Sequence, residues 1–235
     1  MENVLRPRPT GQQTRTVGLG ALVVAGAAAV LSYGVAITLL VVLPSPGASA
    51  GVAQYLVSGL APLVAVAVVH AVRVRDLRAL GIRGVSWRWV LVAVGGGVAA
   101  VLLSIVVTIV VVTLTGPPSD LQADYRSAAR SGPALLVLTL LAGAVLTPVG
   151  EELLFRGVVT NALLKVMSSW VAVPLSAAAF AVAHGISYIT PVAFVVGVVA
   201  ALLFRATGSV WPGVVVHAVN NGYSVLASAR LTPPA

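Results

Sequence analysis

The sequence predicts an all-α membrane protein, a polytopic bundle of seven or eight transmembrane helices. Of its 235 residues, 59% are hydrophobic and only 9% are charged, and the mean hydropathy is +1.04. These values lie far outside the usage of soluble globular or disordered chains. Uncharged runs of roughly twenty residues, the length that crosses a bilayer as a helix, recur along the chain. The absence of cysteine excludes a disulfide-stapled domain.

The first element is a basic tail, residues 1–16, followed by an uncharged run at 17–43. A secretory signal peptide is the alternative, because Ala48-Ser49-Ala50 resembles a cleavage site. An apolar run of this length is well beyond the roughly 7–15 residues of a signal peptide. We therefore expect residues 1–16 to be a cytoplasmic tail, and residues 17–235 to form a single transmembrane domain that begins with a retained span.

Six further apolar runs follow, bounded by proline and glycine as expected where helices begin and end. The runs at 170–185 and 191–204 are short for a complete crossing, so we expect either of them to be tilted, partial or re-entrant. The runs are 51–72, 89–115, 133–150 with a helical continuation to about 166, 170–185, 191–204 and 211–229.

The basic residues predict the orientation in the membrane. The net charge is +8, and most of the basic residues lie in the tail or between Arg73 and Arg88. By the positive-inside rule these segments are cytoplasmic, which predicts a multi-pass protein of the cell membrane with a cytoplasmic N-terminus and an outward-facing segment at 120–130. No basic stripe interleaved with aromatic residues is present, so a nucleic-acid partner is not expected.

Two adjacent glutamates, Glu151 and Glu152, lie inside the apolar stretch 142–159. A charged side chain at membrane depth costs about 2.5–3.5 kcal/mol on insertion scales, so the pair is a candidate functional site. The plainer alternative is an interfacial pair at a helix end. Arg156 follows Glu152 by one helical turn and can neutralise it, which leaves Glu151 free to act as a general acid or base. Pro148 should loosen the helix beside the two carboxylates.

Histidines also occur in the apolar runs, and we expect His184, His217 and Asn221 to converge on the glutamates from separate helices. His70, beside the basic loop, is interpreted as a structural hydrogen-bonding group.

Two chemistries remain open for such a cluster, and both end in hydrolysis. Glu151, Glu152, His184 and His217 could hold a divalent metal such as zinc, which lowers the pKa of bound water. Alternatively, Glu151 with His184 activates water directly while His217 and Asn221 stabilise the oxyanion. A nucleophilic side chain is not favoured, because the chain has no cysteine and no serine in a Gly-x-Ser-x-Gly turn.

Three ordered motifs carry a resemblance to a known family. They are Pro148-Val-Gly-Glu-Glu-Leu-Leu-Phe-Arg-Gly157, Phe180-Ala-Val-Ala-His-Gly185 and Ser209-Val-Trp-Pro-Gly-Val-Val-Val-His-Ala-Val-Asn-Asn221. In order and spacing they resemble the signatures of the CPBP family, which includes CAAX prenyl endopeptidases and bacteriocin-processing or bacteriocin-immunity membrane proteins. The resemblance covers about residues 133–225; the earlier spans match only as generic membrane helices.

The resemblance implies a CAAX-protease-like intramembrane endopeptidase with its active site in a membrane cavity open to the cytoplasm. Glu151 would be the base that activates water, Glu152 and Arg156 its partners, and His184 a second base or metal ligand. His217 and Asn221 would be the oxyanion or ligand pair. The resemblance leaves the metal open. The extra terminal helix of longer eukaryotic members is not expected here, because the chain ends soon after the third motif.

The expected partners are the lipid bilayer and a protein or peptide substrate, for which a prenylated protein and a bacteriocin or pheromone precursor are both candidates. Two other functions remain open: a non-proteolytic scaffold or bacteriocin-immunity protein that uses the cavity for binding, and a proton-coupled transporter. One conflict also remains. If seven spans cross the membrane in alternating directions from a cytoplasmic N-terminus (the helix parity), His184 lies nearer the outer side than Glu151 and His217. Either the fifth span is short and tilted or the parity is wrong.

Overall fold

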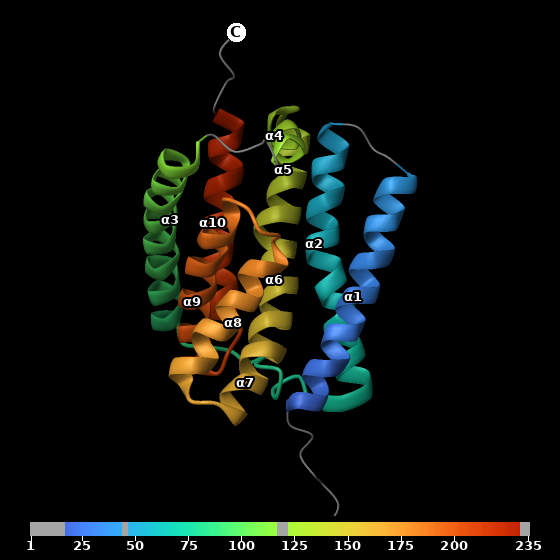
Figure 1. Cartoon of the computed structure of the whole chain (residues 1–235), viewed down its shortest axis with the longest axis vertical. Helices are drawn as coiled ribbons and strands as arrows, with labels where there is room; N and C mark the ends of the chain where they lie inside the picture. The colour runs from blue at the N-terminus through green and yellow to red at the C-terminus, as the bar shows by residue number, and fades with distance from the viewer. Residues whose placement is uncertain (1–16, 44–46, 117–121, 231–235) are drawn as a thin grey trace, which may run out of the picture.

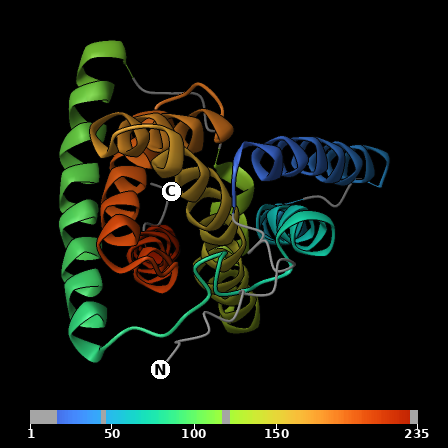
Figure 2. The ribbon, with the colours of Figure 1, turned by 90° about the horizontal axis from the view of Figure 1, so that it is seen from below.

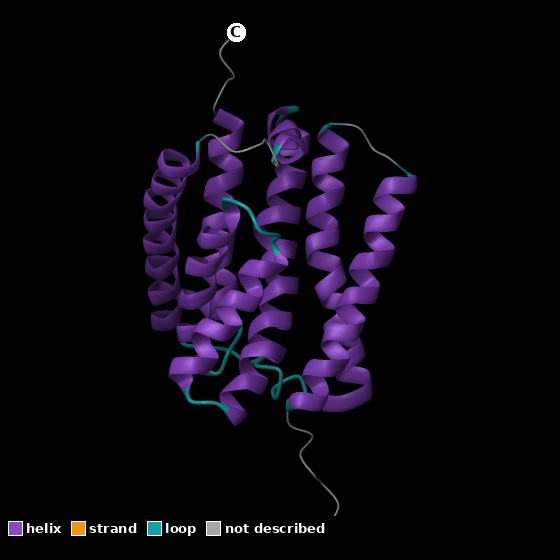
Figure 3. Ribbon diagram, viewed as in Figure 1, coloured by secondary structure: helices purple, strands orange, loops and turns teal. Residues whose placement is uncertain are grey.

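The computed structural model describes residues 17–43, 47–116 and 122–230, and every regular element in these ranges is a helix (Figures 1 and 3). The all-α prediction is therefore confirmed for the described chain. The basic tail predicted at 1–16 lies outside the described residues.

Seven helical stretches coincide with the seven apolar runs, and a short helix, α4, lies between the third and fourth. The fourth run forms one continuous helix that alternates between α and π geometry. The elements are α1 (Leu19–Val42), α2 (Ala48–Val69), η1 (His70–Val74), α3 (Trp87–Thr115), α4 (Ala123–Arg130), α5 (Pro133–Leu140), η2 (Leu141–Leu146), α6 (Thr147–Glu152), η3 (Leu153–Thr160), α7 (Asn161–Val166), α8 (Ser169–Ala183), α9 (Ile189–Thr207) and α10 (Trp211–Arg230).

Five of these helices are long and apolar enough to cross a membrane: α1, α2 with η1, α3, the continuous helix Pro133–Val166, and α9. The other two apolar runs do not meet these criteria. α8 has only 15 residues, and α10 carries His217, Asn220 and Asn221 along its length. The predicted number of spans therefore stays a prediction, whereas the positions of the helices agree with the sequence.

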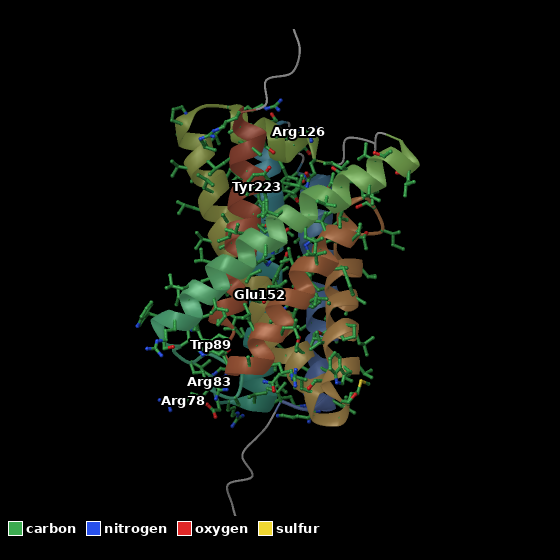
Figure 4. The ribbon with its side chains drawn as sticks, turned by 90° about the vertical axis from the view of Figure 1, so that its left-hand side faces the viewer. Arg78, Arg83, Trp89, Arg126, Glu152 and Tyr223 are labelled. Atoms are coloured by element: carbon green, nitrogen blue, oxygen red, sulfur yellow. The ribbon has the colours of Figure 1, made fainter. Side chains whose placement is uncertain are left out.

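The helices lie roughly side by side and give the molecule two ends of different character (Figure 1). Arg78 and Arg83 lie at one end and Arg126 at the other (Figure 4). We call the first the arginine-rich end; it contains residues 73–88 and the turns that join α7 to α8 and α9 to α10. We call the second the α4 end; it contains α4, the start of α2 and the last turns of α10 (Figure 1).

Close contacts between backbones hold the bundle together. A Cβ on Gly97 of α3 would lie 2.8 Å from Val219 Cβ of α10, and one on Gly96 would lie 3.2 Å from Val199 of α9. Small residues permit this approach, because packing between membrane helices depends on close van der Waals contact. Two of the three consecutive glycines, at 96 and 97, therefore serve helix packing, while Gly95 has no neighbour within 4 Å.

The fourth helix is irregular on both sides of the glutamates. Pro148 has no N–H to donate, so the regular hydrogen-bond ladder is interrupted at the start of α6. The π-helical stretch η2 ends immediately before α6, and η3 begins immediately after Glu152. The expected loosening of the helix beside the carboxylates is confirmed, and π-helical turns of this kind are frequent at functional sites.

The short helix α8 resolves the conflict in helix parity. α8 begins at the arginine-rich end and is inclined to its neighbours, and the chain turns back into α9 before it reaches the α4 end (Figure 1). His184 follows the last residue of α8 and therefore lies part-way through the bundle. The fifth apolar run is therefore short and tilted, which is the first of the two explanations given above for the position of His184.

Candidate active site

Three helical segments far apart in the sequence bring two carboxylates and two imidazoles together. Glu151 and Glu152 end α6, His184 follows α8, and His217 lies in α10. Glu151 Oε2 lies 3.6 Å from His184 Nε2 and 3.9 Å from His217 Nε2, while Glu152 Oε1 lies 3.4 Å from His217 Nδ1. In Figure 4 Glu152 lies between the two ends of the bundle.

Glu152 and Arg156 form a fully buried ion pair, as their spacing predicted. Arg156 Nε lies 3.0 Å from Glu152 Oε2, and both side chains are inaccessible to solvent. The two atoms are at ion-pair distance, but the N–H is not aligned for a hydrogen bond. The guanidinium also lies over the ring of Phe180, 4.8 Å from its centroid. Glu152 is thus compensated and held in place, whereas the Arg156 ion pair does not include Glu151.

Histidine 184 has a defined tautomer when it is neutral. Its Nδ1 lies 2.9 Å from the carbonyl oxygen of Phe180, and a carbonyl only accepts, so Nδ1 carries the proton. The lone pair of Nε2 then faces Glu151. The His184 side chain is 27% exposed, compared with 4% for His217, so it is the imidazole at the accessible side of the cluster.

Histidine 217 lies between the two glutamates. Nδ1 faces Glu152 and Nε2 faces Glu151, so each ring nitrogen has a carboxylate opposite it. A proton on Nδ1 points toward Glu152 and leaves Nε2 directed at the same Glu151 oxygen that His184 faces. Two imidazole Nε2 atoms therefore face one carboxylate oxygen of Glu151.

Several buried polar atoms of the cluster have no hydrogen-bond partner among the described protein groups, which is uncommon in folded proteins outside functional sites. They are Glu151 Oε2, both carboxylate oxygens of Glu152, the three guanidinium nitrogens of Arg156 and His217 Nδ1. The cluster therefore has unused capacity to bind polar atoms of water or of a ligand.

Asn221 lies one turn beyond His217 and makes a different contact from the one expected. Its Nδ2 donates a hydrogen bond of 2.9 Å to the carbonyl oxygen of Gly143, in the π-helical stretch η2. Asn221 also lines the cavity described below. It thus fixes α10 to the fourth helix beside the site, and its second amide hydrogen and its oxygen are not used in that bond.

Two further residues differ from the sequence-based expectations. Phe180 was named as the first residue of the second motif but was given no role, yet its ring contacts both histidines, with centroid distances of 4.7 Å to His184 and 5.5 Å to His217. Its position four residues before His184 was the available signal. His70 lies at the start of η1, away from the cluster, and its Nδ1 is buried without a hydrogen-bond partner, so the expected structural hydrogen bond is wrong for that atom.

A cavity of about 1170 Å³ adjoins the cluster. Glu151, His184 and His217 form its inner part, and Tyr125 and Arg126 of α4 line its far part. The rest of the wall includes parts of α1, α2, α3 and α10 that lie toward the α4 end, the turn between α8 and α9, and the first half of α9, with Leu154, Phe155 and Phe180 beside the cluster. The cavity is large enough for several residues of an extended peptide, since ligand pockets are typically about 300–1,000 Å³.

The expectation that Glu151, Glu152, His184 and His217 could hold a metal stays a prediction. Within the part of the chain that the structure describes, no group of three or more His, Cys, Asp or Glu residues has a geometry that could hold a metal ion. Glu152 is already engaged by Arg156, and only the one carboxylate oxygen of Glu151 faces both Nε2 atoms.

Comparison with known proteins supports the resemblance noted from the motifs. Residues 133–223 match the Rce1-like family model, described as type II CAAX prenyl endopeptidase Rce1-like, in agreement with a CPBP family protease. The matched segment begins with α5 and ends within α10, so it contains the whole cluster and Asn221. No curated protein and no solved structure matches the chain.

Proposed function

From the Rce1-like domain at residues 133–223 we propose that this membrane protein is an intramembrane endopeptidase that hydrolyses peptide bonds with water activated by glutamate and histidine. The observation that carries the proposal is the position of Glu151 Oε2, within 4 Å of two imidazole Nε2 atoms at the inner part of the cavity. A general base next to a space for substrate is the minimum that direct attack by water requires.

Glu151 is the base. A water molecule on the cavity side of Glu151 Oε2 and His184 Nε2 can donate one hydrogen bond to each, because both atoms are acceptors in the neutral tautomer assigned above. The water oxygen attacks the carbonyl carbon of the peptide while its proton passes to Glu151. When the tetrahedral intermediate collapses, the C–N bond breaks and Glu151 returns the proton to the leaving nitrogen.

His217 and Asn221 are proposed to stabilise the oxyanion. When protonated, His217 carries one proton on Nδ1, toward Glu152, and one on Nε2, on the side of Glu151 and the cavity, where negative charge develops. The unused amide hydrogen of Asn221 is a second donor on the same face of α10. Glu152 and Arg156 act through His217, because they fix the carboxylate that faces its Nδ1. They are therefore positioning residues in this proposal.

Replacing Glu151 by glutamine tests the proposal directly. The amide is nearly isosteric but cannot accept the proton, so turnover should fall by about 10²–10⁴-fold, the usual contribution of a positioned general base. The measurement is N- and C-terminal peptide profiling of membranes from cells that carry wild type or Glu151→Gln, followed by cleavage assays with purified protein.

The matched control is Asp76→Asn, which makes the same chemical change at an exposed carboxylate in the arginine-rich loop. It should leave cleavage unchanged, and both variants should reach wild-type abundance. Turnover of purified Glu151→Gln close to that of wild type would refute the assignment. A scaffold or immunity protein would show no Glu151-dependent termini while retaining its binding partner.

A further inference from the structure

The cavity reaches one end of the bundle and not the other. From His217, its wall continues along α10 through Ser224 and Ser228, which follow the histidine by two and three turns on the same helix face. Tyr223, on the same part of α10, is 48% exposed and also lines the cavity, so the space meets the surface near the α4 end. No cavity-lining residue comes from the described loops of the arginine-rich end.

The arginine-rich end is closed by a loop that is hydrogen-bonded across the bundle. Residues 75–86 run from η1 to α3 across this end (Figure 2). Arg83 donates to the carbonyl oxygens of Gly208 and Thr207, at 2.7 and 3.1 Å, and its own carbonyl accepts a hydrogen bond of 2.6 Å from Ser209. These bonds join the loop to the turn between α9 and α10.

Two further contacts fasten the same loop to the fourth helix and fill the space behind it. Asn161 Nδ2 donates to the Ala79 carbonyl at 2.8 Å. Leu80 is fully buried in an apolar cluster with Val158, Phe204 and Val210. A packed apolar layer therefore separates the glutamates from the arginine-rich end.

The charge distribution identifies which side of the membrane each end faces. By the positive-inside rule, the end with the excess of lysine and arginine is cytoplasmic. Among the described residues, the basic side chains at the arginine-rich end are Arg73, Arg75, Arg78, Arg83, Arg88, Lys165 and Arg205, and those at the α4 end are Arg126, Arg130 and Arg230. The positive-inside rule thus assigns the closed end to the cytoplasmic side and the open end of the cavity to the other side.

The side that the charge distribution assigns to the cavity differs from the cytoplasmic side that the family resemblance implies. We infer that the site takes its substrate from the non-cytoplasmic side, and that the substrate is a polypeptide segment exported across the membrane or embedded in its outer leaflet. The inference rests on the proposed peptidase function, and it names the class of segment on which that same site acts.

An apolar opening toward lipid supports the membrane-embedded part of this class. α1 packs on α2 and, at the arginine-rich end, on η1, η3 and α7. Ile37, nearer the α4 end of α1, lines the cavity and is 55% exposed, and Ile186 in the turn between α8 and α9 lines it and is 92% exposed. Apolar side chains that line the cavity are thus exposed both on α1 and on this turn, which suits a segment that arrives from the surrounding lipid.

Cysteine labelling tests the side of access without reference to proteolysis. The chain has no cysteine, so Ser224→Cys and Ser228→Cys each introduce a single reporter in the cavity wall, and Ser86→Cys introduces one at the exposed start of α3. In intact cells a membrane-impermeant maleimide should label positions 224 and 228 but not 86, and permeabilised cells should label all three. Labelling at 86 in intact cells, or protection of both 224 and 228, would overturn the inference.

Mapping of cleavage sites tests the substrate class. Termini that occur with wild type and are absent with Glu151→Gln should lie in exported segments or in the outward half of membrane spans. Glu151-dependent cleavage in cytoplasmic segments would refute the side of access and leave the peptidase proposal standing. A complete lack of Glu151-dependent termini would count against the peptidase, and the labelling result would still decide which side the cavity faces.

Discussion

Replacing Arg156 by alanine should lower the free energy of unfolding by about 3–5 kcal/mol, the usual cost of leaving a buried charge without its partner. The structure supports the upper part of that range. Glu152 and Arg156 are both fully buried, and their charged atoms approach to 3.0 Å. The variant also removes the guanidinium from the face of Phe180, whose ring supports both histidines. Activity should therefore fall together with stability.

Equilibrium unfolding of purified protein in detergent, titrated with a denaturing detergent, measures the change. Arg88→Ala is the matched control, because Arg88 is exposed at the start of α3, and its replacement should change stability by no more than about 0.5 kcal/mol. The double variant Glu152→Gln, Arg156→Met leaves no unpaired charge and should recover most of the lost stability. If Arg156→Ala is as stable as wild type, or the double variant is no better than the single one, the ion pair does not act as described.

Two other substitutions examine the geometry around the glutamates. Gly213→Ala places a Cβ against Glu152 Oε2 and should reduce turnover by displacing that carboxylate. Gly95→Ala is the control, because a Cβ there has no neighbour within 4 Å, and it should leave turnover unchanged. Equal turnover of the two variants would contradict the close contact between Gly213 and Glu152. Asn221→Ala should lower kcat by about 10²–10³ through loss of an oxyanion donor, and wild-type activity should survive thorough chelation. An unchanged kcat would limit the role of Asn221 to its hydrogen bond with Gly143. Loss of activity on chelation that added zinc restores would establish a metal mechanism.

The positions of the helices and the partners of Glu152 could be predicted from the sequence because both depend on local spacing. Apolar runs bounded by proline and glycine gave the helical stretches, and one helical turn separates Glu152 from Arg156. The disturbance of the fourth helix followed from Pro148, whose missing N–H acts wherever proline lies inside a helix. Each of these inferences needs only residues that are neighbours in the chain.

The remaining features depend on contacts between distant segments. The bond from Asn221 to Gly143 requires η2 to expose a carbonyl toward α10, which the hydropathy pattern does not reveal. The direction in which the cavity opens depends on how the loop at 75–86 folds across the bundle end and bonds to Gly208 and Asn161. The role of Phe180 was missed for a similar reason, because its spacing from His184 does not reveal that Arg156 of another helix lies over its ring.

Of the seven helical stretches that coincide with apolar runs, the two that fail the criteria for a membrane span, α8 and α10, are the ones that supply His184 and His217. This follows from the cost of polar groups in lipid, since such groups are tolerated at membrane depth only where they face protein or a polar cavity. α8 places His184 inside the bundle by ending there, where the chain can turn back because the cavity adjoins it. α10 continues and lines the cavity with polar side chains from His217 to Ser228, which lowers its hydropathy. The departure of these helices from ordinary membrane spans is therefore a consequence of the site that they build.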